Sequence, residues 1–124
     1  MKTRTLQLVP MVNPAWAVFA IDDVPNAHGN IFWLESVVAL ALVEHRYPDD
    51  DPDCEVRPVC LVEGAFEILD HQHEGWTQQV IDALPTTDEA RAYLNDAARR
   101  HITEKRERDE KARQRRAGPV ALEA

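Results

Sequence analysis

The sequence has few of the residues that common catalytic and phosphate-binding motifs require. Its 124 residues include four glycines, two cysteines and a single serine, Ser36. The glycines are too scattered to form a phosphate-binding loop, and Ser36 does not lie in a Gly-x-Ser-x-Gly sequence. The sequence therefore offers no motif for P-loop nucleotide binding or for the serine chemistry of α/β-hydrolases.

The sequence also lacks a hydrophobic run that could cross a membrane. No uninterrupted apolar run, residues 37–43 included, is longer than seven residues, whereas a transmembrane helix needs about 20. At the N-terminus, Pro10 and Asn13 interrupt the chain too early for the apolar region of a signal peptide. We therefore expect a cytoplasmic protein with no membrane contact.

The two cysteines, Cys54 and Cys60, are expected to be free thiols. Disulfides persist in oxidising compartments, and we expect no export. If both cysteines lie on one strand, their even spacing places them on the same face but about 20 Å apart, beyond the reach of a disulfide.

Charge is distributed unevenly along the chain. The formal net charge is −8. Residues 1–98 hold five cations and 17 acids, whereas residues 99–116 hold nine cations and four acids. An acidic body therefore carries a basic tail, which indicates that the tail contacts an anionic partner or an acidic protein surface.

Apolar segments predict strands over much of the first 70 residues. Residues 15–22 are apolar on both faces of an extended chain, which is typical of a strand buried on both sides. Residues 31–47 fit either an apolar helix or a strand. The β-rich segments that follow favour the strand, because consecutive strands with short links pair antiparallel. The predicted strands are residues 5–9, 15–22, 37–44 with an entry at 32–36, 54–62 and 65–70.

A short helix is predicted after residue 75. Trp76, Val80 and Leu84 are spaced by four residues, so one apolar face forms if the chain is helical. Pro85 ends the pattern. We therefore predict an amphipathic helix over residues 76–84.

A long helix follows. Thr86 and Glu89 have the spacing of a capping box, which predicts a helix over residues 87–116, and Gly118 and Pro119 predict its end. Beyond residue 102 there is a single apolar residue before position 117, so the second half has almost nothing to bury. The predicted apolar stripe consists of Ala90, Tyr93, Leu94, Ala97, Ala98 and Ile102.

These elements predict an α+β fold. We expect an antiparallel sheet of about four or five strands from residues 5–70, with the short helix and the first half of the long helix on one face. Residues 1–102 are expected to form a single domain, and residues 103–124 a projecting charged helix with a frayed end.

Two histidines form the most suggestive candidate for a metal site. On an extended chain His71 and His73 point the same way, so they could bind one metal ion, zinc for example. A solvated surface loop explains the same residues, and we favour that interpretation because zinc sites use three or four protein ligands. Candidates for a third ligand are Cys54, Cys60, His28 and His45.

The charged segments are the strongest candidates for binding a partner. The acidic run contains Asp49, Asp50, Asp51 and Asp53, lacks the ligand order of a calcium loop, and is expected to be a hairpin loop. Trp33, next to a loop, is a candidate interface anchor. The candidate cations are Arg99, Arg100, Lys105, Arg106, Arg108, Lys111, Arg113, Arg115 and Arg116.

We therefore predict a small, acidic, non-enzymatic protein-binding module that requires no cofactor. Its partner is another protein or a second copy of the chain, and one specific form is an accessory or inhibitory protein whose acidic face occupies a basic site on a nucleic-acid-handling partner. Two alternatives stay open. The arginine-rich helix could bind nucleic acid, and His71 with His73 could serve a metal-binding protein or metalloenzyme.

Overall fold

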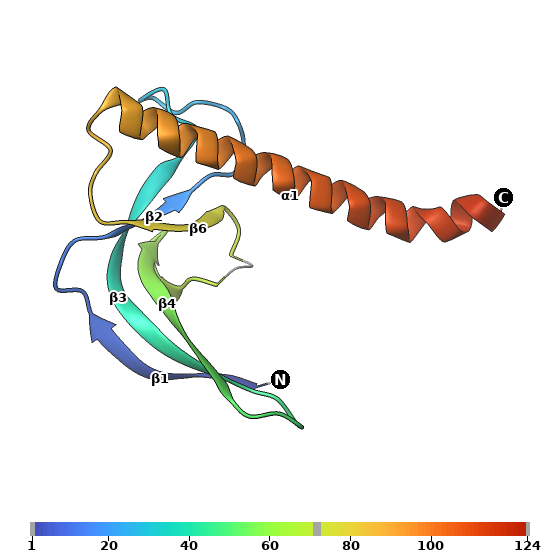
Figure 1. Ribbon diagram of the computed structural model, residues 1–124, viewed down its shortest axis with the longest axis horizontal. Coiled ribbons are helices and arrows are strands. Elements are labelled where there is room, and N and C mark those ends of the chain that lie inside the picture. Colours follow the sequence, from blue (N-terminus) through green and yellow to red (C-terminus); the bar gives the residue numbers. More distant parts are fainter. Residues whose placement is uncertain (1, 71–72, 124) are drawn as a thin grey trace.

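The computed structural model describes residues 2–70 and 73–123, with side chains up to residue 117. All strand pairs are antiparallel, so the predicted α+β class is confirmed (Figure 1). In chain order the elements are β1 (Lys2–Pro10), β2 (Trp16–Phe19), β3 (Trp33–Arg46), β4 (Asp53–Val62), β5 (Ala65–Ile68), β6 (Trp76–Ile81) and α1 (Asp88–Glu123).

Strand β3 is the central element of the six-stranded sheet. Its first residues pair with β2 and its later residues pair with β1, so β1 and β2 share one edge of β3, while β4 pairs along the other edge. The predicted strand within residues 31–47 is therefore confirmed, and it is continuous over 14 residues. β-Bulges between Thr5 and Gln7 and between Val37 and Ala39 bend the strands that carry them, and the sheet curves (Figure 1).

Residues 76–81 form strand β6, so the predicted helix over 76–84 is wrong. β6 pairs antiparallel with β2, with Trp76 opposite Phe19. Because β2 is buried, its second edge would otherwise leave backbone hydrogen-bonding groups without partners, and β6 satisfies them. Trp76 and Val80 are four residues apart. Residues at this spacing lie on one face of a helix and also on one face of a strand, so the spacing fits both structures.

The N-terminus of α1 differs from the predicted capping box. The backbone N–H of Ala90 donates a hydrogen bond to Thr87 Oγ1 at 3.0 Å. Thr87, not Thr86, therefore caps the helix. Asp88 and Glu89 lie in the first turn, where the helix dipole favours negative charge.

At its other end α1 extends to Glu123, so the end predicted at Gly118 and Pro119 is wrong. Proline has a φ that a helix can adopt. It has no backbone N–H, so the helix loses one hydrogen bond at this position, and its stability falls by about 3 kcal/mol. Ala117 and Pro119 are therefore part of one continuous helix.

One hydrophobic core lies between α1 and the sheet. Leu94, Ala98 and Ile102 follow one another at four-residue intervals and are all buried. They form a cluster with sheet and loop residues Val18, Ala20, Ile31 and Phe32. Ile102 is the last buried residue of the helix among the described side chains.

A second core lies on the other face of β2. Phe19 is its largest buried side chain, and its ring stacks on Trp33 with the ring centroids 5.6 Å apart. The cluster also contains Ala15, Ala17, Val37, Cys60 and Leu69. The prediction that the strand within residues 15–22 is buried on both faces is confirmed, although the strand itself is shorter.

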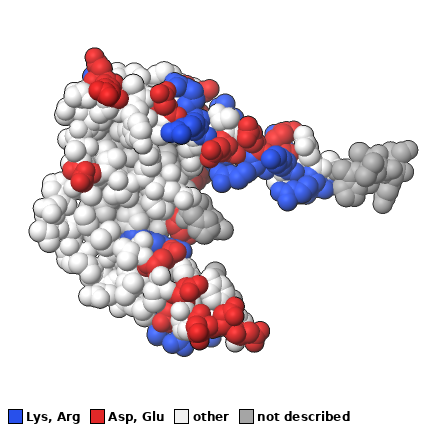
Figure 2. Space-filling model, in the orientation of Figure 1, with Lys and Arg blue, Asp and Glu red and all other residues white. Residues whose placement is uncertain are grey.

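Beyond these two cores, β1 and the distal halves of β3 and β4 form a ribbon (Figure 1). All nine residues of β1 are exposed. Within the ribbon Ala41, Val43 and Val59 form a small buried hydrophobic cluster, and Glu44 and His45 are buried beside it. The ribbon curves away from α1, and Figure 2 shows a hollow between them.

Glu44 joins two strands of the ribbon. Its Oε1 atom accepts hydrogen bonds from Arg46 Nε at 2.6 Å and from Arg4 Nε of β1 at 3.1 Å. The hydrogen bond from Arg46 holds the pKa of Glu44 below its ordinary value, with the charge of Arg4 adding to the effect, although burial opposes it. A charged Glu44 therefore helps to hold β1 against β3.

Candidate functional site

The candidate site is the gap between the projecting half of α1 and the end of the β3–β4 hairpin (Figure 2). α1 leaves the body of the protein after Ile102, and the hairpin extends below it (Figure 1). The two elements form opposite walls of the gap. Both walls consist of segments that sequence analysis singles out for their charge.

The side of α1 that faces the gap continues its buried stripe. Four turns of an α-helix take about 14 residues. Arg108 and Arg116 follow the buried Leu94 and Ile102 by this interval, so they lie on nearly the same side of the helix. The apolar stripe of the first half is thus replaced by arginine in the second half.

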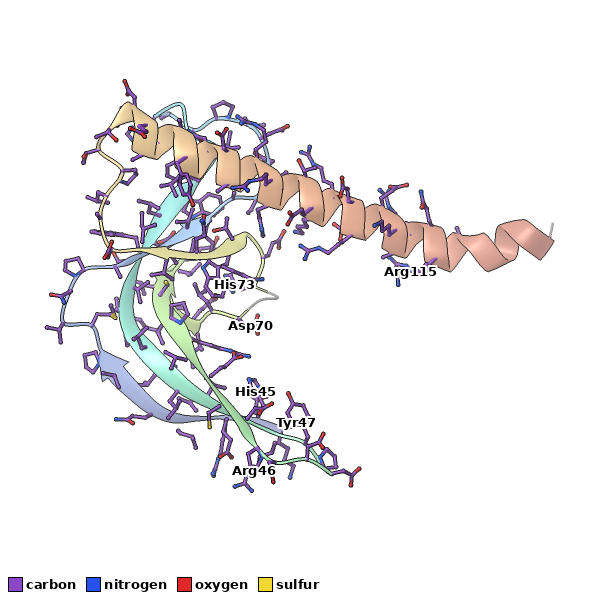
Figure 3. All side chains as sticks on the ribbon, in the orientation of Figure 1. His45, Arg46, Tyr47, Asp70, His73 and Arg115 are labelled. Atoms are coloured by element: carbon purple, nitrogen blue, oxygen red, sulfur yellow. The ribbon has the colours of Figure 1, made fainter. Side chains whose placement is uncertain are left out.

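Two further cations lie on this side. Arg115 follows the half-buried His101 by the same interval, and Figure 3 shows its side chain pointing from the helix toward the gap. Lys105 forms an ion pair with Glu74, which precedes β6, at 3.9 Å. The helix wall of the gap is therefore defined by Lys105, Arg108, Arg115 and Arg116.

Most of the helix wall carries uncompensated charge. Within the part of the chain whose side chains are described, Arg108, Arg115 and Arg116 have no carboxylate partner. Arg116 donates instead to the carbonyl of Ala112 at 3.3 Å. Two acids border the wall, Asp109 on the same side and Glu104 one turn before Arg108. The wall therefore carries net positive charge.

His101 lies close to this positive charge. Burial lowers the pKa of His101 below its ordinary value, and the charges of Arg108 and Lys105 lower it further, while Glu104 opposes them. A cation disfavours a second positive charge nearby. The charges of Arg108 and Lys105 therefore add to burial in disfavouring the charged form of His101.

The opposite wall is the loop at the tip of the β3–β4 hairpin. Its four aspartates are exposed, and in the described chain none of them forms an ion pair. Pro48 and Pro52 restrict the backbone on either side of three of them. This acidic loop is defined by Asp49, Asp50, Asp51 and Asp53, and the expectation of a hairpin loop is confirmed.

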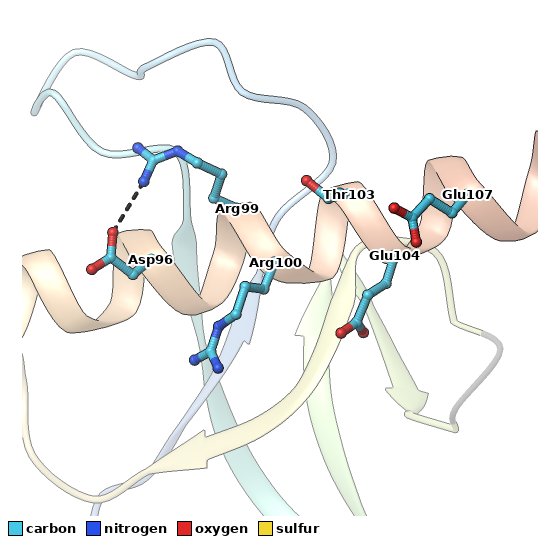
Figure 4. Close-up of a pocket in the computed structure, with 6 residues that line it drawn as sticks. All are labelled: Asp96, Arg99, Arg100, Thr103, Glu104 and Glu107. Carbon is cyan, nitrogen blue, oxygen red and sulfur yellow. Dashed lines mark hydrogen bonds and ion pairs between the residues drawn. The ribbon is translucent and has the colours of Figure 1, made fainter.

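The remaining candidate cations lie elsewhere on α1. Arg106 pairs with Asp23 at 3.5 Å, and Arg113 pairs with Glu110. Arg100 and Lys111, one turn before Glu104 and Arg115 respectively, lie on a flank of α1, and Arg99 lies on its outer side. Figure 4 shows this part of α1, where Asp96, Arg99, Arg100, Thr103, Glu104 and Glu107 line a depression of about 480 Å³.

This depression has no second wall. All six lining residues belong to one helix, and Arg99 is paired with Asp96 at 3.0 Å (Figure 4). Ligand sites enclose most of their ligand. An exposed face of a single helix with charges of both signs cannot do so, and we assign it no binding role.

A polar cluster lies on the ribbon near the gap. Arg57 donates to His45 Nε2 at 3.1 Å, forms an ion pair with Glu55, and approaches Asp70 Oδ2 at 4.0 Å. Thr3 forms a hydrogen bond with the other ring nitrogen of His45 at 3.1 Å. The cluster combines β1, β3 and β4, so it depends on the strand register, which the sequence pattern alone does not give.

Of the candidate metal ligands, the structure describes His73 but not His71, which lies outside the described residues. His73 Nδ1 lies 3.5 Å from Glu67 Oε2, and its ring packs edge-on to Phe19. Among the described residues no group of three or more His, Cys, Asp or Glu could hold a metal ion. A metal site at His71 and His73 stays a prediction.

The other candidate ligands are separated or engaged elsewhere. Cys54 and Cys60 lie on β4, one exposed and one buried, and His45 is bonded to Thr3 and Arg57. Trp33 stacks on Phe19 and belongs to neither wall of the gap.

The two thiols are expected to differ sharply in reactivity. Burial raises the pKa of Cys60 to about 11, with the charge of Glu35 adding to the effect, so this thiol stays protonated at neutral pH. The thiolate is the reactive form, and Cys54 is exposed. A thiol-specific aromatic disulfide should therefore react rapidly with one equivalent in the folded protein and with two in denaturant. Two rapid equivalents without denaturant would contradict the burial of Cys60.

Comparison with protein-family models, with curated proteins and with solved structures gave no match to this chain. In the described chain, no helix is both long enough and apolar enough to cross a membrane. The contacts and charges of the gap are therefore the basis for a functional proposal.

Proposed function

We propose that this protein is a non-enzymatic protein-binding module and that the gap between α1 and the hairpin is its contact surface. One observation carries the proposal. The two walls of the gap have opposite charge, and within the described chain most of that charge has no partner. Uncompensated charges on two projecting elements contribute little to the fold and are available to a partner.

A protein partner fits these walls better than a nucleic acid. A phosphate backbone would be attracted to Arg108, Arg115 and Arg116 but repelled by the acidic loop across the same gap. A folded protein can present both signs of charge at once. The pairing of opposite charges across an interface favours the correct partner and speeds association.

The ribbon also has exposed apolar side chains, on the face opposite to that of His45 and Arg57. Val9 lies opposite Leu40 across the β1–β3 pair, and both are exposed. Val56 is 62% exposed on the neighbouring strand, opposite Leu42. Contiguous exposed apolar side chains mark interaction sites, so this outer face of the ribbon is also available to a protein partner.

The proposal is tested by affinity capture with the full chain from the native host's lysate, treated with nuclease. The test variant carries Arg108→Glu, Arg115→Glu and Arg116→Glu on the helix wall. The control carries Arg99→Glu, Arg106→Glu and Arg113→Glu, which changes the net charge equally at cations of α1 that already have carboxylate partners. We expect one protein to be retained by wild type and control, and its capture to fall at least about tenfold with the test variant.

Three results would overturn the proposal. Capture that disappears after nuclease treatment would indicate nucleic-acid binding through the helix. Equal loss in the test and control variants would indicate a nonspecific effect of net charge. Stoichiometric zinc in the protein purified without chelator, lost in the His71→Ala/His73→Ala variant, would indicate a metal-binding function.

A further inference from the structure

We propose that the protein bound at the gap is a second copy of this chain, in a two-fold symmetric dimer. The helix wall of each copy contacts the acidic loop of the other. This inference rests on the proposed function, because it names the partner that the same surface binds.

The gap has the property that a two-fold dimer requires. In such a dimer the same surface occurs on both sides of the axis, so it must be complementary to itself. The helix wall is positive, the acidic loop is negative, and both border one hollow (Figure 2). A two-fold rotation of one copy about an axis through the mouth of the gap generates the second copy. This rotation places the positive wall of each copy against the negative wall of the other.

Charges on both walls are available for this contact. Arg108, Arg115 and Arg116 have no carboxylate partner among the described side chains, and Arg115 points toward the gap (Figure 3). The aspartates of the acidic loop likewise form no ion pair within the described chain. Each contact would therefore bring together three unpaired cations and four unpaired acids.

The opposite side of α1 does not offer the same complementarity. There Arg99, Arg106 and Arg113 are already paired with Asp96, Asp23 and Glu110. Charges of both signs alternate on that side, so it attracts an acidic loop weakly. The excess of positive charge is on the side of the helix that faces the gap.

The predicted dimer depends strongly on salt. Exposed ion pairs are individually weak, so several must act together. Raising the salt concentration from about 0.02 M to about 0.5 M shortens the Debye length from about 20 Å to about 4 Å. We expect the association constant to fall at least about tenfold over this range.

The test is a charge exchange followed by sedimentation equilibrium of the full chain. The helix variant carries Arg108→Glu, Arg115→Glu and Arg116→Glu, and the loop variant carries Asp49→Lys, Asp50→Lys and Asp51→Lys. In each variant the two walls carry charge of the same sign, so two copies of that variant repel each other. In an equimolar mixture both contacts are again attractive, because one copy has two negative walls and the other has two positive walls.

At low salt we expect wild type to reach twice the 14.1 kDa of a single chain. The helix and loop variants should each be monomeric, and their mixture should regain the doubled mass. The control with Arg99→Glu, Arg106→Glu and Arg113→Glu should dimerise like wild type, because these cations already have carboxylate partners. If the circular dichroism spectrum of each variant matches that of wild type, its loss of association is not caused by unfolding.

Several outcomes would overturn the inference. The inference would be overturned if wild type stays monomeric at low salt, if the mixture stays monomeric, or if the control dissociates like the helix variant. A mass that keeps rising past the dimer would overturn the two-fold arrangement. If wild type is monomeric but affinity capture still depends on the helix wall, the proposed function stands and the second copy is not its partner.

Discussion

Replacement of Phe19 by alanine is expected to lower the free energy of unfolding by about 3–5 kcal/mol. The Phe19 side chain is 2% exposed, packs with Ala17 and Leu69, and stacks on Trp33. Alanine leaves a cavity beside β2, which is buried on both faces and cannot collapse without moving either β3 or β6. Urea unfolding monitored by tryptophan fluorescence measures the loss.

The matched control is Phe66→Ala on β5. The Phe66 side chain is 71% exposed, so the same chemical change should alter the free energy of unfolding by about 0.5 kcal/mol or less. A loss at Phe66 as large as that at Phe19 would contradict the location of the core.

Replacement of Leu94 by alanine is expected to cost about 2–5 kcal/mol. Leu94 is 4% exposed and docks the first half of α1 on Val18 and Phe32. A substitution at this position therefore weakens the main hydrophobic contact between helix and sheet. Thermal or urea unfolding, followed by the far-ultraviolet circular dichroism of α1, measures the effect.

The control removes residues 107–124. This deletion keeps Ile102 and the ion pairs of Lys105 with Glu74 and of Arg106 with Asp23. Because the removed segment has no buried side chain among those described, the free energy of unfolding should change by about 1 kcal/mol or less. A loss comparable to that of Leu94→Ala would mean that the projecting half of α1 supports the fold.

The strands of the first 70 residues could be predicted because each has its own local signal. Residues 15–22 are apolar on both faces, and this pattern matches the double burial of β2. The choice of a strand for residues 31–47 depended on the β-rich segments that follow, which supply β4 as its partner and β5 as the partner of β4. Local pattern together with a nearby partner was sufficient there.

Strand β6 could not be predicted in this way. Its partner β2 lies about 60 residues earlier in the sequence, and the spacing of Trp76 and Val80 suits both a helix and a strand. What decides the structure is the free edge of β2, which is a property of the folded sheet. A long-range hydrogen-bonding requirement therefore overrides the local pattern.

The charges of the candidate site could be predicted, but their arrangement could not. Sequence analysis singles out the acidic loop and the cations of α1 separately. Helical spacing then separates Arg108 and Arg116 from Arg99 and Arg106, but only after Leu94 and Ile102 are known to face the sheet. The direction of the hairpin relative to α1 depends on the bulges and curvature of the sheet, for which the sequence has no simple signal.

The most direct test of the gap as contact surface is amide NMR of the isotope-labelled full chain, diluted stepwise at low salt. We expect the concentration-dependent shifts to be confined to residues 49–53 and 105–117, and to disappear at high salt. Shifts centred on β6 or on the outer side of α1 would contradict the assignment of the gap as the contact surface. The absence of shifts in a sample that sedimentation shows to be associated would contradict it as well.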